Sequence, residues 1–219
     1  MASINNLNEV AQNALQKAVI IDSLKEGIQE FTVDDLKVFT SSVRDINLNI
    51  GNANHALLTG DQDLDIVGND NDNFIVGNDG SNWIDAGNGN DQIATGAGDD
   101  FIKLGAGDDV IEIDGPGDKT VNGGEGNDLF VIKPGLGENS HVTFTNLNVG
   151  DKLRVYADAN QDGKITWDDV ESVGPDADGN TTFVLKDGSS FTLEGVGNQD
   201  DITYTIGEDG EGNLYVELS

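Results

Sequence analysis

The chain of 219 residues lacks several features that would place it in a common class of protein. It contains no cysteine, and its aromatic residues amount to only 6%. Without cysteine it forms neither disulfide bonds nor thiolate metal sites. It also has no apolar run long enough to cross a bilayer and no basic-then-apolar signal peptide at its N-terminus. We therefore expect no membrane insertion and no disulfide framework.

Basic residues are scarce as well. The chain has 11 lysines and arginines against 41 acidic residues, a formal net charge of −30, yet 36% of its residues are hydrophobic. This hydrophobic share is too high for a wholly solvated acidic tail. A charge of this sign and size opposes binding to nucleic acid or to an anionic membrane, and it favours cations. The expected partners are therefore cations and not nucleic acid.

Motifs of the common catalytic sites are missing. The sequence has no HExxH zinc motif, no G-x-S-x-G elbow and no phosphate-binding P-loop. Its two histidines, His55 and His141, have no evident partner in the sequence. Acid pairs are abundant, so residue types alone leave a glycosidase open. Because the acids fall on the repeat positions described next, we expect a protein that is not an enzyme.

Glycine and acidic residues, by contrast, recur in a nine-residue repeat. From Ala86 to Val131 the chain reads AGNGNDQIA, TGAGDDFIK, LGAGDDVIE, one extra residue (Ile113), DGPGDKTVN and GGEGNDLFV. Each unit has glycine at its second and fourth positions and an apolar residue at its eighth. An acid stands sixth in every unit except the fourth, which has Lys119. A flexible Gly/Asp-rich linker is the alternative, but a linker has no reason to keep its apolar residues in phase.

Units this short cannot bury their one large apolar side chain alone, so they must stack. Six residues of each unit form a turn, and three form a short strand whose middle side chain points inward. Two units then make one coil of the stack. The sequence therefore predicts a mainly β fold, a parallel β-roll solenoid, with these inward side chains: Ile93, Ile102, Ile111, Val121 and Phe130.

The repeat extends backwards from Ala86 in a weakened form. Its apolar eighth position persists through four earlier units, at Leu57, Ile66, Ile75 and Ile84, so the solenoid is expected to begin near residue 50. The sixth position of the same units becomes His55, Leu64, Asn73 and Asn82. These early coils should be held by packing and turn hydrogen bonds. His55 is expected to be a plain surface residue rather than a metal ligand.

The turn chemistry predicts a bound cation, because glycines leave backbone carbonyls uncovered and the sixth residue supplies a carboxylate. Oxygen-only ligands suit a hard cation such as calcium. Parallel strands stack about 4.8 Å apart, so Asp91 should face Asp109, and Asp109 should face Asp128. At about 5 Å and an effective dielectric near 20, each uncompensated carboxylate pair repels by roughly 3 kcal/mol. A domain stable by only about 5–15 kcal/mol cannot tolerate several such pairs, so the coil should not form without the ion.

These units resemble the RTX (repeats-in-toxin) calcium-binding nonapeptides, and GGEGNDLFV, AGNGNDQIA and LGAGDDVIE are close matches. The resemblance implies a β-roll that binds several Ca2+ ions and folds outside the cell, after one-step type I export directed by an uncleaved C-terminal signal. It also implies ligands at the first, third, fourth and sixth positions of the units that carry a sixth-position acid. These candidate metal-binding residues are Ala86, Asn88, Gly89, Asp91, Thr95, Ala97, Gly98, Asp100, Leu104, Ala106, Gly107, Asp109, Gly123, Glu125, Gly126 and Asp128.

Lys119 interrupts this pattern on one side of the predicted roll. The turns 77–82, 95–100 and 114–119 stack there, and Lys119 follows Asp100 at the sixth position. A cation therefore stands where a ligand is required. The gap between the last two turns should be empty or bound only through Asp118 and carbonyls, unless Lys119 replaces the ion and pairs with Asp100 directly.

Residues 1–45 are predicted to be a helical N-terminal cap. Apolar residues recur near helical spacing over 3–31, and Thr32 begins an N-cap pattern that predicts a second helix through about Val43. Such a pair most simply covers the open apolar end of the first coil. A partner-binding helix is the alternative.

The nine-residue period is lost after Val131, so the roll is predicted to close near Pro134 and to span 46–133. Residues 134–219 are predicted to form a β-hairpin-rich segment. Its expected turns and hairpins are at 176–180, at 187–188, and between 202–206 and 214–218. This segment resembles, more loosely, the one that follows the repeats in many type I secreted proteins. On that resemblance alone we expect the secretion signal near its C-terminal end.

The same segment contains an EF-hand-like loop, DANQDGKITWDD, at 158–169. Its spacing of side-chain oxygens and its central glycine fit the calcium loop of an EF-hand, although position twelve is Asp169 instead of glutamate. The candidate ligands are Asp158, Asn160, Asp162, Lys164 and Asp169. We expect a calcium ion that joins a strand to a short helix at 167–171. The alternative is an Asx-rich turn without an ion.

The sequence thus predicts a secreted calcium-binding protein that folds on calcium binding and serves as a structural, surface-layer or adhesion component. The alternative is a glycan-binding or accessory module of an extracellular enzyme. A glycan site would need exposed aromatic residues, for which Trp83, Trp167 and the three tyrosines are the candidates. Besides calcium, the partners to test are therefore an extracellular glycan and a second copy of the chain.

Overall fold

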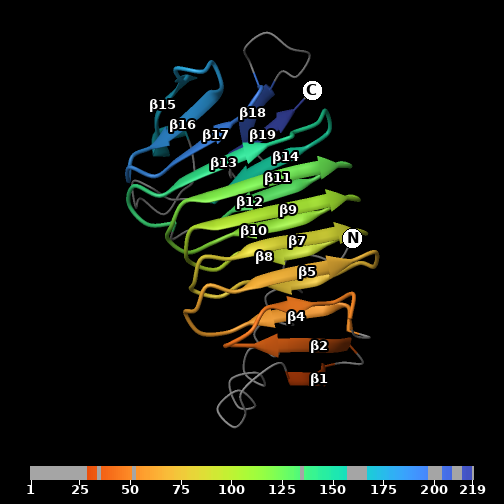
Figure 1. The fold of residues 1–219 in the computed structure, drawn as a ribbon. Helices are drawn as coiled ribbons and strands as arrows, with labels where there is room; N and C mark the ends of the chain where they lie inside the picture. Colours follow the sequence, from red (N-terminus) through yellow and green to blue (C-terminus); the bar gives the residue numbers. More distant parts are fainter. Residues whose placement is uncertain are drawn as a thin grey trace.

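The structure, a computed structural model, describes residues 29–33, 36–50, 53–133, 136–156, 167–196, 204–208 and 214–218. Within these residues two β-sheets, of ten and nine strands, face each other across one apolar core (Figure 1). Sheet A has the order β1 (Gln29–Val33), β2 (Leu36–Ser41), β4 (His55–Leu58), β6 (Phe74–Val76), β8 (Gln92–Ala94), β10 (Val110–Ile113), β12 (Leu129–Ile132), β14 (Lys152–Val155), β19 (Leu214–Leu218) and β18 (Tyr204–Glu208).

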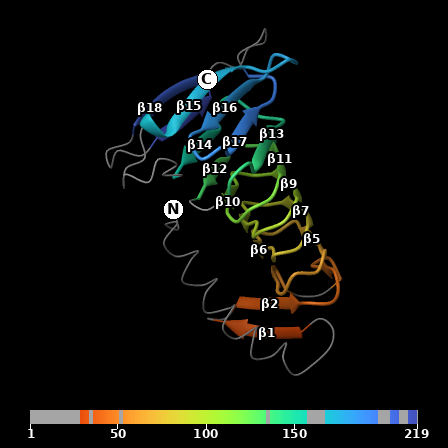
Figure 2. The ribbon, with the colours of Figure 1, turned by 90° about the vertical axis from the view of Figure 1, so that its left-hand side faces the viewer.

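Sheet B has the order β15 (Val170–Pro175), β16 (Thr181–Leu185), β17 (Ser190–Leu193), β13 (His141–Thr145), β11 (Lys119–Glu125), β9 (Asp100–Ala106), β7 (Trp83–Asn88), β5 (Asp65–Asn69) and β3 (Ile46–Asn47). From β3 to β14 the chain alternates between the two sheets, so that two strands and their turns make one coil. Figure 2 shows the coils following one another along the stack. The predicted parallel β-roll is confirmed.

The apolar eighth positions form the core of the roll. Ile75, Ile93 and Ile111 align across sheet A, while Ile84 and Ile102 align across sheet B. All five side chains are fully buried. The aligned partners in each sheet are 18 residues apart, and the extra residue Ile113 raises that spacing to 19 between the following coils. Two nine-residue units therefore make one coil, as the sequence predicted.

The N-terminal end of the described roll is a β-hairpin and not the predicted second helix. β1 and β2 pair antiparallel, and β2 then pairs in parallel with β4. Val38 and Thr40 alternate into the buried side of β2. Branched side chains at alternating positions fit a pleated strand, and β4 offers an edge whose backbone groups need partners, so strand pairing outweighs the helical spacing. The first predicted helix lies outside the described residues except for 29–31, which are strand.

The stack continues beyond residue 133, where the sequence predicted that it closes. β13 and β14 pair in parallel with β11 and β12, and β17 pairs in parallel with β13. Phe144 extends the core column that contains Ile102 and Val121, and both Val121 and Phe144 are fully buried. A further coil therefore follows the repeats, although its sequence has lost the nine-residue period.

Antiparallel hairpins cover the C-terminal end of the stack. β15, β16 and β17 continue sheet B, and β18 with β19 continue sheet A. The turns at 176–180 and 187–188 lie where they were predicted. The last hairpin is present with its second strand at Leu214–Leu218 as predicted, but its first strand is Tyr204–Glu208 and not 202–206. The predicted helix at 167–171 is shorter, because a 3-10 helix at Trp167–Asp169 leads directly into β15. In the described part of the chain no helix has the length and apolar character needed to cross a membrane.

Candidate metal centre

The turns that join the sheets stack in two files along the two edges of the roll (Figure 1). The first file contains the turns 68–73, 86–91, 104–109 and 123–128, which lead from sheet B to sheet A. The second file contains 77–82, 95–100 and 114–119, which lead from sheet A back to sheet B. The predicted repeat ligands thus divide between the files, with those of 95–100 in the second file and all others in the first.

Glycine allows these turns to stack closely. Gly107 has a φ of 139°, and a Cβ atom there would collide with the carbonyl oxygen of Gly89 in the preceding coil. Its amide donates a hydrogen bond of 2.9 Å to the carbonyl of Glu125 in the following coil. Only glycine combines this φ with such a close approach, so the repeat places backbone carbonyls of neighbouring coils side by side.

Four carboxylates lie one above the next inside the first file. The Oδ1 atoms of Asp91, Asp109, Asp128 and Asp151 accept the backbone N–H of the corresponding residue one coil earlier, at 2.7, 2.7, 3.0 and 2.9 Å. All four residues are at least 99% buried. The predicted pairing of Asp91 with Asp109 and of Asp109 with Asp128 is therefore confirmed, and Asp151 adds a member that the sequence did not predict.

Three of these carboxylates keep an oxygen without a partner. Within the described residues, the buried Oδ2 atoms of Asp91, Asp109 and Asp128 accept no hydrogen bond. Burial raises the pKa of Asp91 and Asp128 to about 7 and the pKa of Asp109 to about 6, while the amide hydrogen bonds oppose the shift and neighbouring carboxylates add to it. Buried carboxylates are stable only when they are paired or coordinate a metal.

The donor set of the first file fits calcium. Its free side-chain oxygens come from carboxylates, and its neighbouring carbonyls retain a second lone pair beside the hydrogen bond that they accept. The side chains of Ala86 and Leu104 are buried in the core, so these two candidate ligands have only their carbonyls to offer. In the described part of the chain, no three Asp, Glu, His or Cys side chains gather at one point. Calcium here would therefore depend on carbonyls together with pairs of aspartates.

The second file is built differently at its sixth positions. From one coil to the next it holds Leu64, Asn82, Asp100, Lys119 and then Val142, all of them buried. Asp100 accepts the amide of Asn82 at 2.9 Å, as in the first file. Its other oxygen lies 3.2 Å from Nζ of Lys119, and both side chains are completely buried. The alternative in which Lys119 pairs with Asp100 directly is confirmed.

The fifth position of each unit has a role that the sequence interpretation missed. In the first file Asn90, Asp108 and Asn127 each direct their backbone N–H to the fifth-position side chain one coil earlier, at 2.8 to 3.0 Å. The second file repeats this with Ser81, Asp99 and Asp118. These side chains are exposed. The signal was visible, because Asn, Asp or Ser stands fifth in each of these units.

Both histidines have partners, contrary to expectation. Nδ1 of His55 accepts the backbone N–H of Phe74 at 3.1 Å, so this partly buried ring joins two coils instead of lying free on the surface. Burial lowers the pKa of His55. Nδ1 of His141 lies 2.7 Å from the hydroxyl of Ser190.

The EF-hand-like loop lies almost entirely outside the described residues, including Asp158, Asn160, Asp162 and Lys164. Asp169 is described: it ends the 3-10 helix, is 1% exposed, and its carbonyl accepts the amide of Lys186 at 2.9 Å. A calcium ion in this loop stays a prediction.

The stacked coils and their facing carboxylates define this part of the chain as a parallel β-solenoid with oxygen-lined turns. Comparison with family models matches the RTX calcium-binding nonapeptide repeat in four copies, at residues 67–102 and 87–112. This segment of the chain therefore consists of RTX repeats, and such repeats imply calcium as the ligand. No curated protein sequence matches the chain.

Proposed function

We propose that the protein is a secreted calcium-binding β-roll that folds on calcium binding outside the cell and serves as a structural, surface-layer or adhesion component. The observation that carries this proposal is the row of buried Oδ2 atoms of Asp91, Asp109 and Asp128, which have no partner in the described residues. These residues and the neighbouring carbonyls would hold several calcium ions between successive turns of the first file.

Calcium would supply the positive charge that this file lacks. Ions that bind the folded chain and not the unfolded chain stabilise the fold by RT ln(1 + [L]/Kd) at each site. At low calcium the facing carboxylates repel one another, and the chain stays unfolded. This behaviour suits type I export, in which an unfolded chain leaves a low-calcium cytosol and folds where calcium is abundant.

A calcium titration tests the proposed folding. Circular dichroism should show little β structure in chelator and a cooperative gain at millimolar calcium. Magnesium should replace calcium poorly, because its strict octahedral geometry does not match turns that depend on carbonyls. An identical folded spectrum with and without chelator would contradict the proposal.

The proposed structural role needs an assembly test of its own. Light scattering of the calcium-loaded protein should reveal association that chelator reverses. A monomer at all calcium concentrations would favour a binding role instead. We propose no catalytic role, since the fifth- and sixth-position acids of the repeats are used in the stacking of the turns.

The EF-hand-like loop would provide a separate ion site. Asp158→Ala should then remove one bound ion while the repeat turns stay loaded, because the two sets of candidate ligands share no residue. An unchanged ion count by calorimetry would show that the loop is empty.

A groove on sheet B favours saccharide binding as a second function. It has a volume of about 510 Å³ and crosses the outer face of β5, β7, β9 and β11. Gly87, Gly105 and Gly124 align along its floor, where missing side chains leave space. Lys103 pairs with Asp85 at 3.2 Å on one wall, and asparagine amides line much of the rest, together with Asp70 and Glu125. These amide and carboxylate groups are hydrogen-bond donors and acceptors that suit the hydroxyl groups of a sugar.

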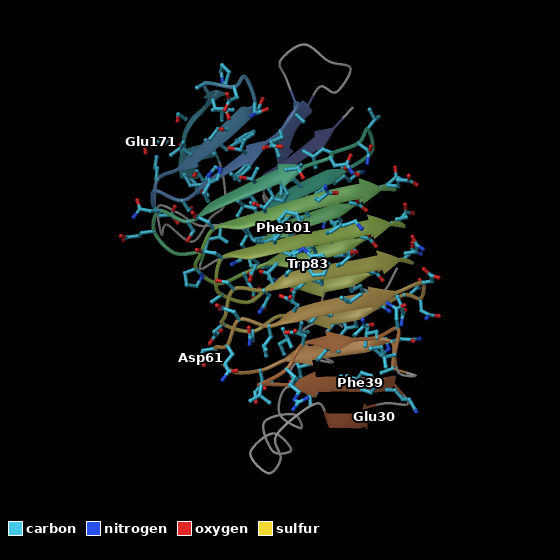
Figure 3. The ribbon with its side chains drawn as sticks, viewed as in Figure 1. Glu30, Phe39, Asp61, Trp83, Phe101 and Glu171 are labelled. Atoms are coloured by element: carbon cyan, nitrogen blue, oxygen red, sulfur yellow. The ribbon has the colours of Figure 1, made fainter. Side chains whose placement is uncertain are left out.

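Two exposed aromatic side chains flank this groove. Trp83 and Phe101 are opposite each other on β7 and β9, with exposures of 38% and 44%. Figure 3 shows them one above the other on the same sheet face. Aromatic faces stack on the apolar faces of sugar rings, and Trp83 is one of the residues named for this role from the sequence. A glycan array should detect binding that Trp83→Ala abolishes, whereas Val149→Ala, at an exposed position outside the groove, should leave it unchanged.

A further inference from the structure

The gap between turns 95–100 and 114–119 differs from every gap in the first file. Within the described residues, Lys119 is the only buried lysine, and its side chain is completely inaccessible to solvent. Lysine is almost never buried to this extent unless a negative partner compensates its charge. Its ammonium group therefore belongs to a specific arrangement inside this gap.

The ammonium group contacts two of the oxygens that were predicted to bind calcium. Nζ of Lys119 lies 3.2 Å from Oδ2 of Asp100 and donates a hydrogen bond of 2.8 Å to the carbonyl of Gly98. Asp100 and Gly98 hold the sixth and fourth positions of the unit 95–103. A lysine side chain thus occupies the place that an inter-turn cation would require.

Besides Asp100, these two turns contain three acids, Asp99, Asp114 and Asp118, and none of them is fully buried. Asp114 accepts the amide of Gly96 at 3.0 Å, and Asp99 accepts the amide of Asp118 at 2.8 Å. Asp118 directs Oδ1 to the amide of His141 in the next coil, at 2.9 Å, and its carbonyl accepts the amide of Asp100 at 3.0 Å. Calcium binding through Asp118 is therefore not favoured. The buried part of the gap holds one carboxylate, that of Asp100, and one ammonium, and the formal charges of this buried pair cancel.

The first file has no such cancellation. Asp91, Asp109 and Asp128 are buried there in consecutive coils, and the lysine-for-aspartate exchange at the sixth position occurs only in the second file of the described roll. The buried carboxylates at the two edges of the solenoid therefore need different partners: a lysine in the second file and a bound cation in the first.

We propose that Lys119 permanently replaces a calcium ion between turns 95–100 and 114–119, so that this gap is closed without metal while the first file depends on it. The inference rests on the proposed calcium binding of the first file. In the second file, the ion pair of Lys119 with Asp100 then joins two neighbouring coils without calcium. These are the coils between which Ile113 lengthens the repeat by one residue. In the folded roll this ion pair holds the register of β9 against β11 without a bound ion.

Crystals of the wild-type protein grown in calcium give the first test. Anomalous scattering near the calcium edge should show ions between Asp91 and Asp109 and between Asp109 and Asp128, and none beside Lys119. A fully occupied ion between turns 95–100 and 114–119 would overturn the inference. This measurement needs no variant and therefore no assumption about how a variant folds.

Ion counting by mass spectrometry gives the second test. Lys119→Asp restores the carboxylate and should raise the calcium content by one ion per chain. Lys103→Asp makes the same change of charge at a half-exposed position on the sheet face, and should leave the calcium content unchanged. Lys119→Met removes the ammonium without adding a ligand, so it should lower the thermal midpoint and add no ion.

The outcomes separate the inference from the proposed function. A folded Lys119→Asp variant with the wild-type ion count, beside a wild type that is loaded in the first file, contradicts the inference alone. A wild type that binds no calcium in the first file contradicts the proposed function.

Discussion

At the scale of single residues, the sixth position of each unit decides how a coil is neutralised. Asp109 lies between Asp91 and Asp128, and its Oδ2 has no partner in the described residues. Lysine at the equivalent position of the second file supplies a charge of its own. The sequence shows both residue types at sight, but only the structure shows that the lysine reaches Asp100.

Asp109→Asn should have opposite effects with and without calcium. The amide oxygen still accepts the amide of Asp91, but a carboxylate shared by two neighbouring gaps is lost. We expect the calcium concentration for half-maximal folding to rise at least tenfold, which corresponds to about 1.4 kcal/mol. In chelator the variant should be more stable than the wild type, because one buried charge is gone.

Asp108→Asn is the matched control for that experiment. Asp108 is exposed and accepts the amide of Asn127, a contact that asparagine preserves. Its calcium midpoint, followed by circular dichroism, should stay within a factor of two of the wild type. Equal shifts in the two variants would show that the buried file is not the calcium site.

Gly107→Ala should destabilise the calcium-loaded roll. A positive φ costs a residue with a Cβ about 1–3 kcal/mol, and the collision with the carbonyl of Gly89 adds to this cost. Gly174→Ala is the control, because nothing lies within 4 Å of its added Cβ. Urea denaturation at saturating calcium should show a large loss for the first variant and a change within about 0.5 kcal/mol for the second. Similar losses would refute a special role for the turn glycine.

At the scale of elements, prediction succeeded where a strand belongs to a repeat. The eighth-position residues from Ile66 to Phe130 are buried in the described roll, as their phase predicted. In the first unit the phase was wrong by one residue, because Ala56 and not Leu57 aligns with Ile75. The prediction failed at both ends of the roll, where strands form because they pair with the neighbouring strand and not because they belong to a repeat. β2 joins the stack because β4 leaves an edge to pair with. The coil after residue 133 lengthens until Asp151 follows Asp128 by 23 residues, so no nine-residue period reveals it.

The site followed the same division. Facing aspartates were predictable because the period fixes which residues stack. Asp151 was not, because its coil has no period. The hydrogen bonds between fifth-position residues were signalled by the recurrence of Asn, Asp and Ser at that position. Only the structure shows which amide donates to which side chain. The ion pair between Lys119 and Asp100 was one of several arrangements that the sequence left open, since the sequence alone does not reveal where the end of a long side chain lies.

The coil beyond the repeats should fold together with the roll. Phe144 on β13 packs edge-on against Phe130 on β12, with ring centroids 5.0 Å apart and an interplanar angle of 64°. Phe144→Ala should cost about 3–5 kcal/mol at saturating calcium, in one transition that includes the repeats. Phe101→Ala removes an exposed ring and should cost far less. A double-mutant cycle with Phe130→Ala should give a coupling of about 0.5–1.5 kcal/mol, and two separate transitions would contradict joint folding.

At the scale of the whole molecule, the question is whether calcium acts by occupying sites or by screening a chain with a formal charge of −30. The two mechanisms differ in what sodium chloride does. At 1 M salt the Debye length is about 3 Å, so exposed charges such as the fifth-position acids are largely screened, while buried pairs are screened much less. The residues Asp91, Asp109 and Asp128 are 99% buried, so a diffuse ion atmosphere does not reach their facing oxygens.

We therefore expect molar sodium chloride in chelator to leave the chain without its β-roll spectrum, whereas millimolar calcium at low ionic strength restores it. Salt added to the calcium-loaded protein should shift its calcium midpoint only modestly, since general repulsion is the minor part of the effect. Asp109→Asn provides the control for buried charge. It removes one negative charge, as the exposed Asp108→Asn does, but it should gain more stability in chelator. Circular dichroism with ion counting measures both arms. If sodium chloride alone produced the folded spectrum, the roll would be held by screening, and the oxygen-lined turns would not be the reason that it folds.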